Sequence, residues 1–342
     1  MSKELPFVTV VMPVRNEAGY IERCLKAVVE QDYPAERMEI IVADGMSTDA
    51  TREIIQSFHS RFANIRLPNI RLVDNPGKIA PTGLNRATEM AKGEIIARVD
   101  GHCEIAPDYI SRAVEHLQNE EVDGVGGPIE TIGETATAEV IAVAMSSVFG
   151  VGGSTFRTVK DKTMLADTIA FPVYKRTIIE RAGGYDEELV RNQDDEYNYR
   201  LRKLGAKLLL AANVRSRYYS RGSVQKLFKQ YFQYGFWKVR VLQKHPRQMS
   251  LRQFIPPAFV ASLLGSLGLA AITSLGWWIF TGIIGCYLTV NLLASARILL
   301  SIRPYRIQFF LLPAVFASLH LSYGLGFLVG FVKFAPRWRM RQ

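Results

Sequence analysis

The chain has 342 residues, which is enough for more than one structural unit, and its charge is strongly polarised. Residues 1–196 contain 21 basic and 32 acidic residues, a net charge of −11, whereas residues 197–342 contain 21 basic residues and no acidic one, a net charge of +21. No charged residue lies between Arg252 and Arg297 or between Arg306 and Lys333, and neutral apolar runs of this length indicate membrane-spanning segments. A basic region beside such segments favours an anionic membrane surface as its partner and argues against nucleic acid.

The remaining composition narrows the cellular setting. The three cysteines, Cys24, Cys103 and Cys286, are scattered and odd in number, which argues against a disulfide framework and favours a reducing compartment. The N-terminus reads as a short strand rather than a signal peptide, so the membrane anchor is expected at the C-terminal end.

Strands and helices are expected to alternate along the first hundred residues. Apolar runs predict strands at residues 7–13, 38–43, 70–73 and 94–99, and helical spacing predicts helices at residues 18–31, 51–62 and 82–91. Such alternation is typical of the α/β class with a doubly wound, mainly parallel sheet.

Polar residues follow the predicted strands, where open α/β sheets bind their ligands. Asp44 ends the second strand, well placed to accept hydrogen bonds from a ribose or a base, and Asp49 could cap the helix that follows. Asn16-Glu17 stands where a dinucleotide-binding protein has a glycine-rich loop, which disfavours hydride transfer. Asp100, after the fourth strand, could hold a divalent cation against a phosphate, or could be an ordinary turn residue.

Five segments in order resemble a known family. They are PVRNE after the first strand, ADGMSTDAT after the second, NPGK and GLNRA between residues 75 and 87, VDGH after the fourth strand, and residues 183–204 with GGYDE and QDDE. They resemble the motifs of inverting, family 2 glycosyltransferases, which have the GT-A fold. The likeness covers roughly residues 7–240, and within the family it is strongest to bacterial exopolysaccharide enzymes of the succinoglycan type.

The resemblance implies a nucleotide-sugar donor, most plausibly a UDP-sugar, and a divalent cation, Mn²⁺ or Mg²⁺. Asp100 becomes the primary metal ligand, and His102 stands where the family usually has the last Asp of Asp-x-Asp. Because imidazole suits manganese better than magnesium, a preference for manganese is a hypothesis; the alternative is that His102 faces the acceptor or only packs. The same resemblance puts Asp44, Pro13 and Glu17 in the nucleotide pocket.

Two further roles follow from the resemblance. Lys78 lies in a glycine-containing loop and could reach the base, ribose or diphosphate, or could be a solvated surface lysine. Asp194 takes the place of the base that removes the proton of the acceptor hydroxyl, although Gln193 replaces the first acid of the family's pair and leaves Asp195 as a fallback. The alternative for Asp194 is to cap a helix at residues 195–203. Residues 165–171 and the loop 150–157 are expected to shape the acceptor pocket.

The C-terminal part is expected to associate with a membrane. We expect a cytoplasmic catalytic domain at residues 1–220, amphipathic interfacial helices at 221–253, and a membrane domain at 254–342 with apolar segments at 258–275, 277–296 and 308–332. The amphipathic stretch could instead pack on the catalytic domain. Three crossings would put the basic C-terminal tail outside, against the positive-inside tendency, so the third segment is either a crossing that breaks the rule or a re-entrant segment.

The sequence thus predicts a metal-dependent inverting glycosyltransferase in a bacterial inner membrane, multi-pass, with its catalytic domain in the cytoplasm. It would move a single sugar to a lipid-linked acceptor of the polyprenyl diphosphate type, with other glycan-assembly enzymes as further candidate partners. A processive polysaccharide synthase is one alternative, although Phe236 replaces the Arg of that group's Gln-x-x-Arg-Trp element. A non-catalytic sugar-nucleotide-binding subunit is the other.

Overall fold

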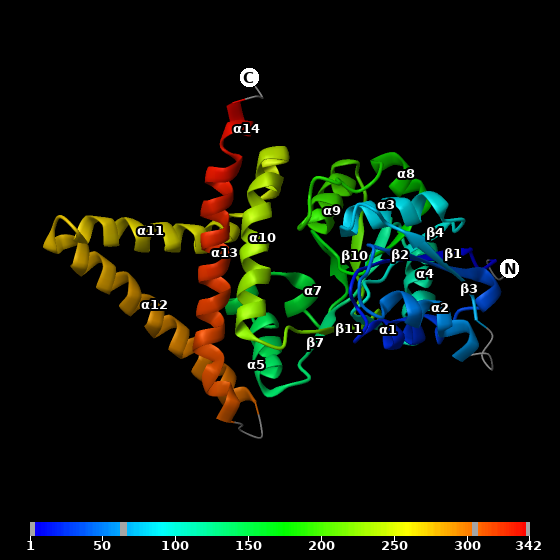
Figure 1. Cartoon of the computed structure of the whole chain (residues 1–342), viewed down its shortest axis with the longest axis horizontal. Coiled ribbons are helices and arrows are strands. Elements are labelled where there is room, and N and C mark those ends of the chain that lie inside the picture. Colours follow the sequence, from blue (N-terminus) through cyan, green and yellow to red (C-terminus); the bar gives the residue numbers. More distant parts are fainter. Residues whose placement is uncertain (1–3, 62–66, 303–306, 340–342) are drawn as a thin grey trace. The chain divides into compact units, whose positions relative to one another are not determined.

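A computed structural model describes residues 4–61, 67–302 and 307–339 (Figure 1). The chain divides into two compact units, one made of Met1–Glu130 and Thr155–Tyr218 and the other of Thr131–Ser154 and Tyr219–Gln342. Residues 131–154 therefore belong with the C-terminal helices, although they lie within the range 1–220 expected for the catalytic domain.

The first unit is built on an eight-stranded sheet with the strand order β3-β2-β1-β4-β9-β6-β10-β8. Its strands are β1 (Val8–Val14), β2 (Met38–Asp44), β3 (Asn69–Asp74), β4 (Ile95–Arg98), β6 (Gly124–Gly126), β8 (Met164–Leu165), β9 (Val173–Lys175) and β10 (Leu208–Leu210). Its helices are α1 (Ile21–Val29), α2 (Thr51–Arg61), α3 (Ala80–Met90), α4 (Tyr109–Asn119), α7 (Thr155–Thr158), α8 (Arg176–Ala182) and α9 (Gln193–Lys203).

The N-terminal half of this sheet is parallel, as the alternation of strands and helices predicts. β1 pairs in parallel with both β2 and β4, and β2 pairs in parallel with β3. Strands covered on both faces can be apolar throughout, and every residue of β2 is buried. Val11, Ile41 and Ile96 from three strands pack against Leu84 of α3, which fixes that helix on one face of the sheet.

The other half is mixed. β9 runs antiparallel to both β4 and β6, and β8 runs antiparallel to β10. A short strand, β5 (Cys103–Ile105), follows Asp100 and His102 and pairs with β11 (Ser216–Tyr219). The observed fold is thus a GT-A-like mixed α/β sheet, parallel at the end that carries the first four predicted strands.

The second unit consists mainly of helices. They are α5 (Ala136–Met145), α6 (Val148–Val151), α10 (Val224–Lys244), α11 (Ile255–Ala270), α12 (Ser274–Ser301), α13 (Leu312–Phe334) and α14 (Pro336–Arg339), and β7 (Ile129–Ile132) leads into them. Three stretches are long and apolar enough to cross a membrane, namely Leu251–Ala270, Ser274–Ser301 and Ile307–Phe334. They coincide closely with the three predicted segments.

The amphipathic stretch forms α10, and α10 packs along α13 (Figure 1). Glycines permit the contact, because a Cβ on Gly326 would lie 2.1 Å from the Phe232 carbonyl oxygen and one on Gly330 would lie 2.5 Å from that of Phe236. The partner of the α10 apolar face within the second unit is therefore a membrane-type helix.

Candidate active site

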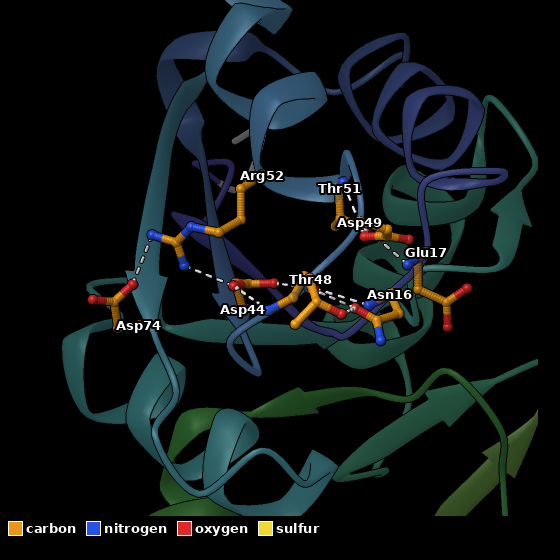
Figure 2. Close-up of polar contacts among 9 residues, drawn as sticks. Asn16, Glu17, Asp44, Thr48, Asp49, Thr51, Arg52 and Asp74 are labelled. Atoms are coloured by element: carbon orange, nitrogen blue, oxygen red, sulfur yellow. Dashed lines mark hydrogen bonds and ion pairs between the residues drawn. The ribbon is translucent and has the colours of Figure 1, made fainter.

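The turn after β2 is organised around the carboxylate of Asp44, which is fully buried. Its Oδ2 accepts hydrogen bonds from the Ser47 backbone N–H at 3.0 Å and from Arg52 Nη1 at 2.6 Å, and its Oδ1 accepts one from the Ser47 hydroxyl. Arg52 also contacts Asp74 at 2.8 Å, so the guanidinium joins the ends of β2 and β3 (Figure 2). The hydrogen bonds that Arg52 donates to these two carboxylates raise its pKa above the ordinary value.

The loop after β1 is tied to the same turn. The Asn16 backbone N–H donates to Ser47 Oγ at 2.8 Å, and Asn16 Oδ1 accepts from the Thr48 N–H at 2.8 Å (Figure 2). The Glu17 backbone N–H donates to Thr51 Oγ1 at 2.8 Å, while the Glu17 carboxylate points away from this network. Hydrogen bonds therefore join the two loops at this edge of the sheet, and the Glu17 carboxylate is left to make another contact.

Asp49 supports this edge from within. Its carboxylate accepts hydrogen bonds from the backbone N–H groups of Ala18 and Thr51, both at 3.1 Å. Burial alone would raise the pKa of Asp49, but the hydrogen bonds from Thr51 and Ala18 outweigh it and hold the pKa below its ordinary value. As expected, Asp49 lies at the start of α2 and accepts a hydrogen bond there; it also anchors the loop of Glu17.

Pro13 lies at a position of β1 where no backbone N–H is needed for pairing with β4. The Val11 carbonyl accepts from the Val99 N–H, so Val11 and Pro13, two residues on, turn their backbone polar groups toward β4. The pairing of β1 with β4 ends at Val11 opposite Arg98. Pro13 is beyond that point, and the two strands separate there without losing a hydrogen bond.

Asp100 follows β4 and pairs with Arg98, a residue for which no role is predicted from the sequence. Arg98 Nε and Nη2 donate to the two carboxylate oxygens at 2.9 and 3.1 Å. Burial alone would raise the pKa of Asp100, but the Arg98 guanidinium holds it below its ordinary value. The carboxylate therefore stays ionised in an enclosed position, with 21% of its side chain exposed.

His102 lies beside Asp100 and contacts the loop after β1. Its Nδ1 is 3.0 Å from Glu17 Oε1, and its ring meets that of Tyr218 edge-on at 5.4 Å between centroids. The Glu17–His102 contact thus joins the ends of β1 and β4, and the hydrogen bond at Nδ1 fixes which ring nitrogen remains for a ligand.

A divalent cation fits these residues only with help from a substrate. Among the residues that the structure describes, no group of three or more His, Cys, Asp or Glu side chains is arranged to hold a metal ion. Asp100 and His102 offer one carboxylate and one imidazole, and cations that act on nucleotides commonly take their other ligands from phosphates and water. Cys103 is fully buried, where burial raises the pKa of its thiol well above the ordinary value, so it is a packing residue.

Asp194 lies in the first turn of α9 and is exposed. The helix begins at Gln193, with Asn192 as its N-cap in a left-handed conformation, so Asp194 is not the capping residue. Glu196 is buried and bound by Arg200 through two hydrogen bonds of 2.9 and 3.1 Å. Asp194 accepts a hydrogen bond from the Asp195 N–H at 2.9 Å, and its carboxylate faces the surface.

Asp100 is hydrogen-bonded to Arg98, and the charge of Asp194 also acts on this guanidinium. Burial opposes the charge of Arg98, but the nearby Asp100, Tyr185 and Asp194 raise the pKa of this arginine above its ordinary value. The Arg98 guanidinium lies over the Tyr185 ring, 6.0 Å from its centroid. Burial, with Asp194 and Asp100 nearby, raises the pKa of the Tyr185 hydroxyl to about 12, although Arg98 opposes this.

The GGYDE loop that carries Tyr185 is attached to α3 by Asn85. Asn85 Oδ1 accepts from the Tyr185 N–H at 2.6 Å, and its Nδ2 donates to the Tyr185 carbonyl and to Glu187, both at 2.9 Å. A cavity of about 560 Å³ opens between α3 and α8, lined among others by Asn85, Arg98, Arg176 and Tyr185. Arg98 thus separates this cavity from Asp100.

Lys78 is exposed at the tip of the Asn75–Lys78 turn. Asn75 builds the turn by donating to the Ile79 carbonyl and accepting from Thr82. The Lys78 carbonyl accepts from Arg15 at 3.2 Å, which ties the turn to the loop after β1 and leaves the ammonium directed at solvent or a ligand.

Backbone strain marks the same region. In the described part of the chain, five residues other than glycine have a positive φ: Asn16, Met46, Lys78, Phe171 and Asn192. Four lie in the loops that carry Glu17, Asp44, Lys78 and Asp194, and Phe171 ends the 165–171 stretch expected at the acceptor pocket. Strained backbone of this kind gathers at functional sites because the surrounding contacts maintain it.

Comparison with known proteins shows the family of this chain. Residues 9–182 match the glycosyl transferase family 2 model. The chain is 31% identical to the succinoglycan biosynthesis protein ExoA of Rhizobium meliloti, over 79% of this chain and 81% of that protein. It is 29% identical, over 96% and 98% of the two chains, to a dolichyl N-acetyl-α-D-glucosaminyl phosphate 3-β-D-2,3-diacetamido-2,3-dideoxy-β-D-glucuronosyltransferase of Methanococcus voltae.

Solved structures share the fold at low identity. The mannosyltransferase PcManGT of Pyrobaculum calidifontis, in complex with GDP-Man and Mn²⁺, aligns over 94% of this chain and 88% of its own with a TM-score of 0.57 and 20% identity. TarS 1–349 of S. aureus in complex with UDP-GlcNAc aligns over 96% and 91% with a TM-score of 0.51 and 15% identity. The chain belongs to glycosyl transferase family 2, and it has the GT-A fold expected from its motifs.

Proposed function

We propose that this protein is a membrane-anchored, metal-dependent, inverting glycosyltransferase that moves one sugar from a nucleotide donor to a lipid-linked saccharide acceptor. The observation that carries the proposal is the Asp100 carboxylate after β4 of a family 2 domain, paired with Arg98 by two hydrogen bonds, with the charge of Asp194 acting on the same guanidinium. The relative in Methanococcus voltae, named for a dolichyl phosphate-linked substrate, and the succinoglycan protein support an acceptor of polyprenyl phosphate or diphosphate type and a role in cell-surface or exopolysaccharide synthesis.

Each residue has a task in this proposal. Asp44 and the turn it organises, with Pro13 and Glu17, form the nucleotide side, and Lys78 approaches the base, ribose or diphosphate. Asp100 and His102 would hold a divalent cation, which when bound neutralises the charge of the departing diphosphate. The neighbours named for GDP-Man with Mn²⁺ and for UDP-GlcNAc support a nucleotide sugar with a cation, and we favour a UDP-sugar.

Asp194 would act as the base. Its carboxylate accepts the proton of the acceptor hydroxyl, the hydroxyl oxygen forms a bond to the anomeric carbon, and the bond from that carbon to the diphosphate oxygen breaks on the opposite face, which inverts the centre. An exposed carboxylate bound by a single backbone N–H suits this role better than Glu196, whose oxygens are both engaged by Arg200.

Transfer of one sugar is favoured over processive synthesis by the surroundings of Phe236. Phe236 on α10 packs against α13, with its ring centroid 5.0 Å from that of Phe334, and Trp237 donates a hydrogen bond to Gln233 at 3.2 Å. This element therefore serves the packing of α10. A catalytic domain at residues 1–220 facing the cytoplasm of a bacterial cell, with 221–253 at the membrane surface and a membrane-associated domain at 254–342, completes the proposal.

A screen of radiolabelled nucleotide sugars with membranes that contain the protein tests this function. Label should enter the lipid extract with one sugar per acceptor, and it should not when the membranes carry Asp194→Asn. A ladder of longer products would instead establish processive synthesis, and binding of a nucleotide sugar without transfer or donor hydrolysis would establish a non-catalytic subunit.

A further inference from the structure

Three apolar helices suggest three membrane crossings, but the extent to which protein buries each helix differs strongly. Of the most apolar part of each candidate span, 17% is buried by protein in the first, 11% in the second and 50% in the third. The first two belong to α11 and α12, and the third is α13. Protein therefore covers much of α13, whereas most of the surface of α11 and α12 remains open for contact with lipid.

The hairpin of α11 and α12 projects away from α10 and α13 (Figure 1). Its base touches α13: a Cβ on Gly324 would meet the Pro256 carbonyl oxygen at 2.4 Å, and Asn291 donates to the Pro313 carbonyl at 2.9 Å. Nearer the tip the helices are open, because a Cβ on Gly265, Gly268, Gly282 or Gly285 would meet no atom within 4 Å.

This hairpin has the length and composition of a membrane insertion. The 20 residues Leu251–Ala270 extend about 30 Å at about 1.5 Å per residue, the thickness of a hydrocarbon core. No charged residue lies between Arg252 and Arg297, and the exposed Trp277 and Trp278 lie within a turn of the tip, where tryptophan prefers the lipid headgroups.

The partner of α13 argues against a third crossing. α10 lies beside α13 from Gly235, opposite the Tyr323 carbonyl, to Gln243, which donates to the Phe334 carbonyl at 2.8 Å. α10 carries five cations and no acidic residue: Lys226, Lys229, Lys238, Arg240 and Lys244. If α13 crossed the bilayer, α10 would enter it too, and each cation near the bilayer centre costs about 2.5–3.5 kcal/mol on the insertion scale.

We propose that, within the described chain, only the α11–α12 hairpin crosses the bilayer, and that α13 lies with α10 in the plane of the membrane surface. The exposed stripe of α13, which includes Leu325, Val329 and Val332, would rest on the acyl chains. Two crossings return the chain to the side from which it entered. The basic residues at both ends of the hairpin and the C-terminal tail then share one side, in keeping with the positive-inside tendency.

Side-specific labelling tests this topology independently of any glycosyltransferase activity. Full-length protein with Cys286→Ser, which leaves only the buried Cys24 and Cys103, would receive a single new cysteine as Glu121→Cys, Ala271→Cys or Gln342→Cys. A membrane-impermeant maleimide applied to sealed vesicles of known orientation should label Glu121→Cys and Gln342→Cys from one side and Ala271→Cys from the other. Labelling of Gln342→Cys from the same side as Ala271→Cys would overturn the proposal.

Depth measurements test the orientation of α13 itself. Spin labels at Leu325, Val329 and Val332 should give equal depths in the bilayer, whereas labels at Leu264, Leu267 and Ala271 of the hairpin should give depths that change along the helix. A depth that changes by about 1.5 Å per residue along α13 would contradict the proposal.

The α10–α13 pair can be tested with matched glycines. Gly326→Leu should lower the melting temperature of the detergent-solubilised protein, because the new side chain meets the Phe232 carbonyl oxygen, whereas Gly285→Leu enters open space and should leave it nearly unchanged. Equal melting temperatures for the two variants would remove the close α10–α13 contact on which the proposal rests.

Discussion

The turn after β2 and the first turn of α9 both present acidic side chains, yet their surroundings are opposite. Asp44 is fully buried, and both of its carboxylate oxygens accept hydrogen bonds from protein groups. Asp194 is exposed and accepts a single hydrogen bond from the next backbone N–H. In the proposed mechanism this difference matches two roles: Asp44 maintains the shape of the site, and Asp194 remains available to accept a proton.

Asp194→Asn should have the largest effect on activity. Removal of the base should lower the rate of sugar transfer about 10²–10⁴-fold, because an amide accepts no proton at neutral pH. Donor binding, measured by calorimetry on the same preparation, should be unchanged. Asp195→Asn is the matched control and should retain most of the activity; the reverse pattern would assign the base to Asp195.

Arg98→Gln should have the next largest effect, since Arg98 pairs with Asp100 and the charge of Asp194 acts on the same guanidinium. Loss of the guanidinium leaves the enclosed Asp100 carboxylate unpaired, and we expect a fall in activity of about 10–100-fold, equivalent to about 1.4–2.7 kcal/mol. Arg98→Lys keeps the charge but not the two-point contact and should recover only part of it. Full activity of Arg98→Gln would show that Arg98 has no part in positioning Asp100.

Asp44→Ala should act mainly on stability. The variant leaves the Ser47 backbone N–H without its acceptor and Arg52 with Asp74 as its other carboxylate partner, and the loss of a buried acceptor costs about 1–3 kcal/mol. Asp74→Ala removes only the more exposed partner of Arg52 and should cost about 1 kcal/mol or less. Chemical denaturation of the two variants compares these costs, and equal values would contradict a shaping role for Asp44.

Asp49→Asn should give the smallest effect, and one that depends on pH. Because the pKa of Asp49 is depressed in the folded protein, its ionised form contributes stability above about pH 4, which is lost as pH falls through the depressed value. The variant should therefore unfold more readily than the wild type at pH 7, and the difference should shrink below pH 4. A difference in melting temperature that is constant from pH 7 to pH 3 would exclude this contribution.

Much of the fold follows from local patterns. The strands β1 to β4 were predicted because their β-branched and apolar runs, which are buried in β1, β2 and β4, differ plainly from the helical spacing between them. The antiparallel β9 was not, since three residues, Val173–Lys175, are too few to show a period. Its direction depends on which strands it joins rather than on its own residues.

The sequence points to the candidate carboxylates but not to all of their partners. Arg98 stands two residues before Asp100, and side chains two apart in extended chain share a face, so this pair was within reach of the sequence. The link from Arg98 to Tyr185 and Asp194 was not, because it joins segments almost a hundred residues apart. The α10–α13 contact had a signal in Gly326 and Gly330, which are four residues apart as in closely packed membrane helices.

Asn85 gives the two sides of the site a mechanical connection. Its amide binds the N–H and the carbonyl of Tyr185 and also the Glu187 carboxylate, so the loop before α9 is attached to α3. If a donor nucleotide orders the turn that precedes α3, we expect the loop that leads to Asp194 to be ordered with it. Substrates on such a frame should associate in a fixed sequence, donor first, with the second ligand held more tightly once the first has arrived.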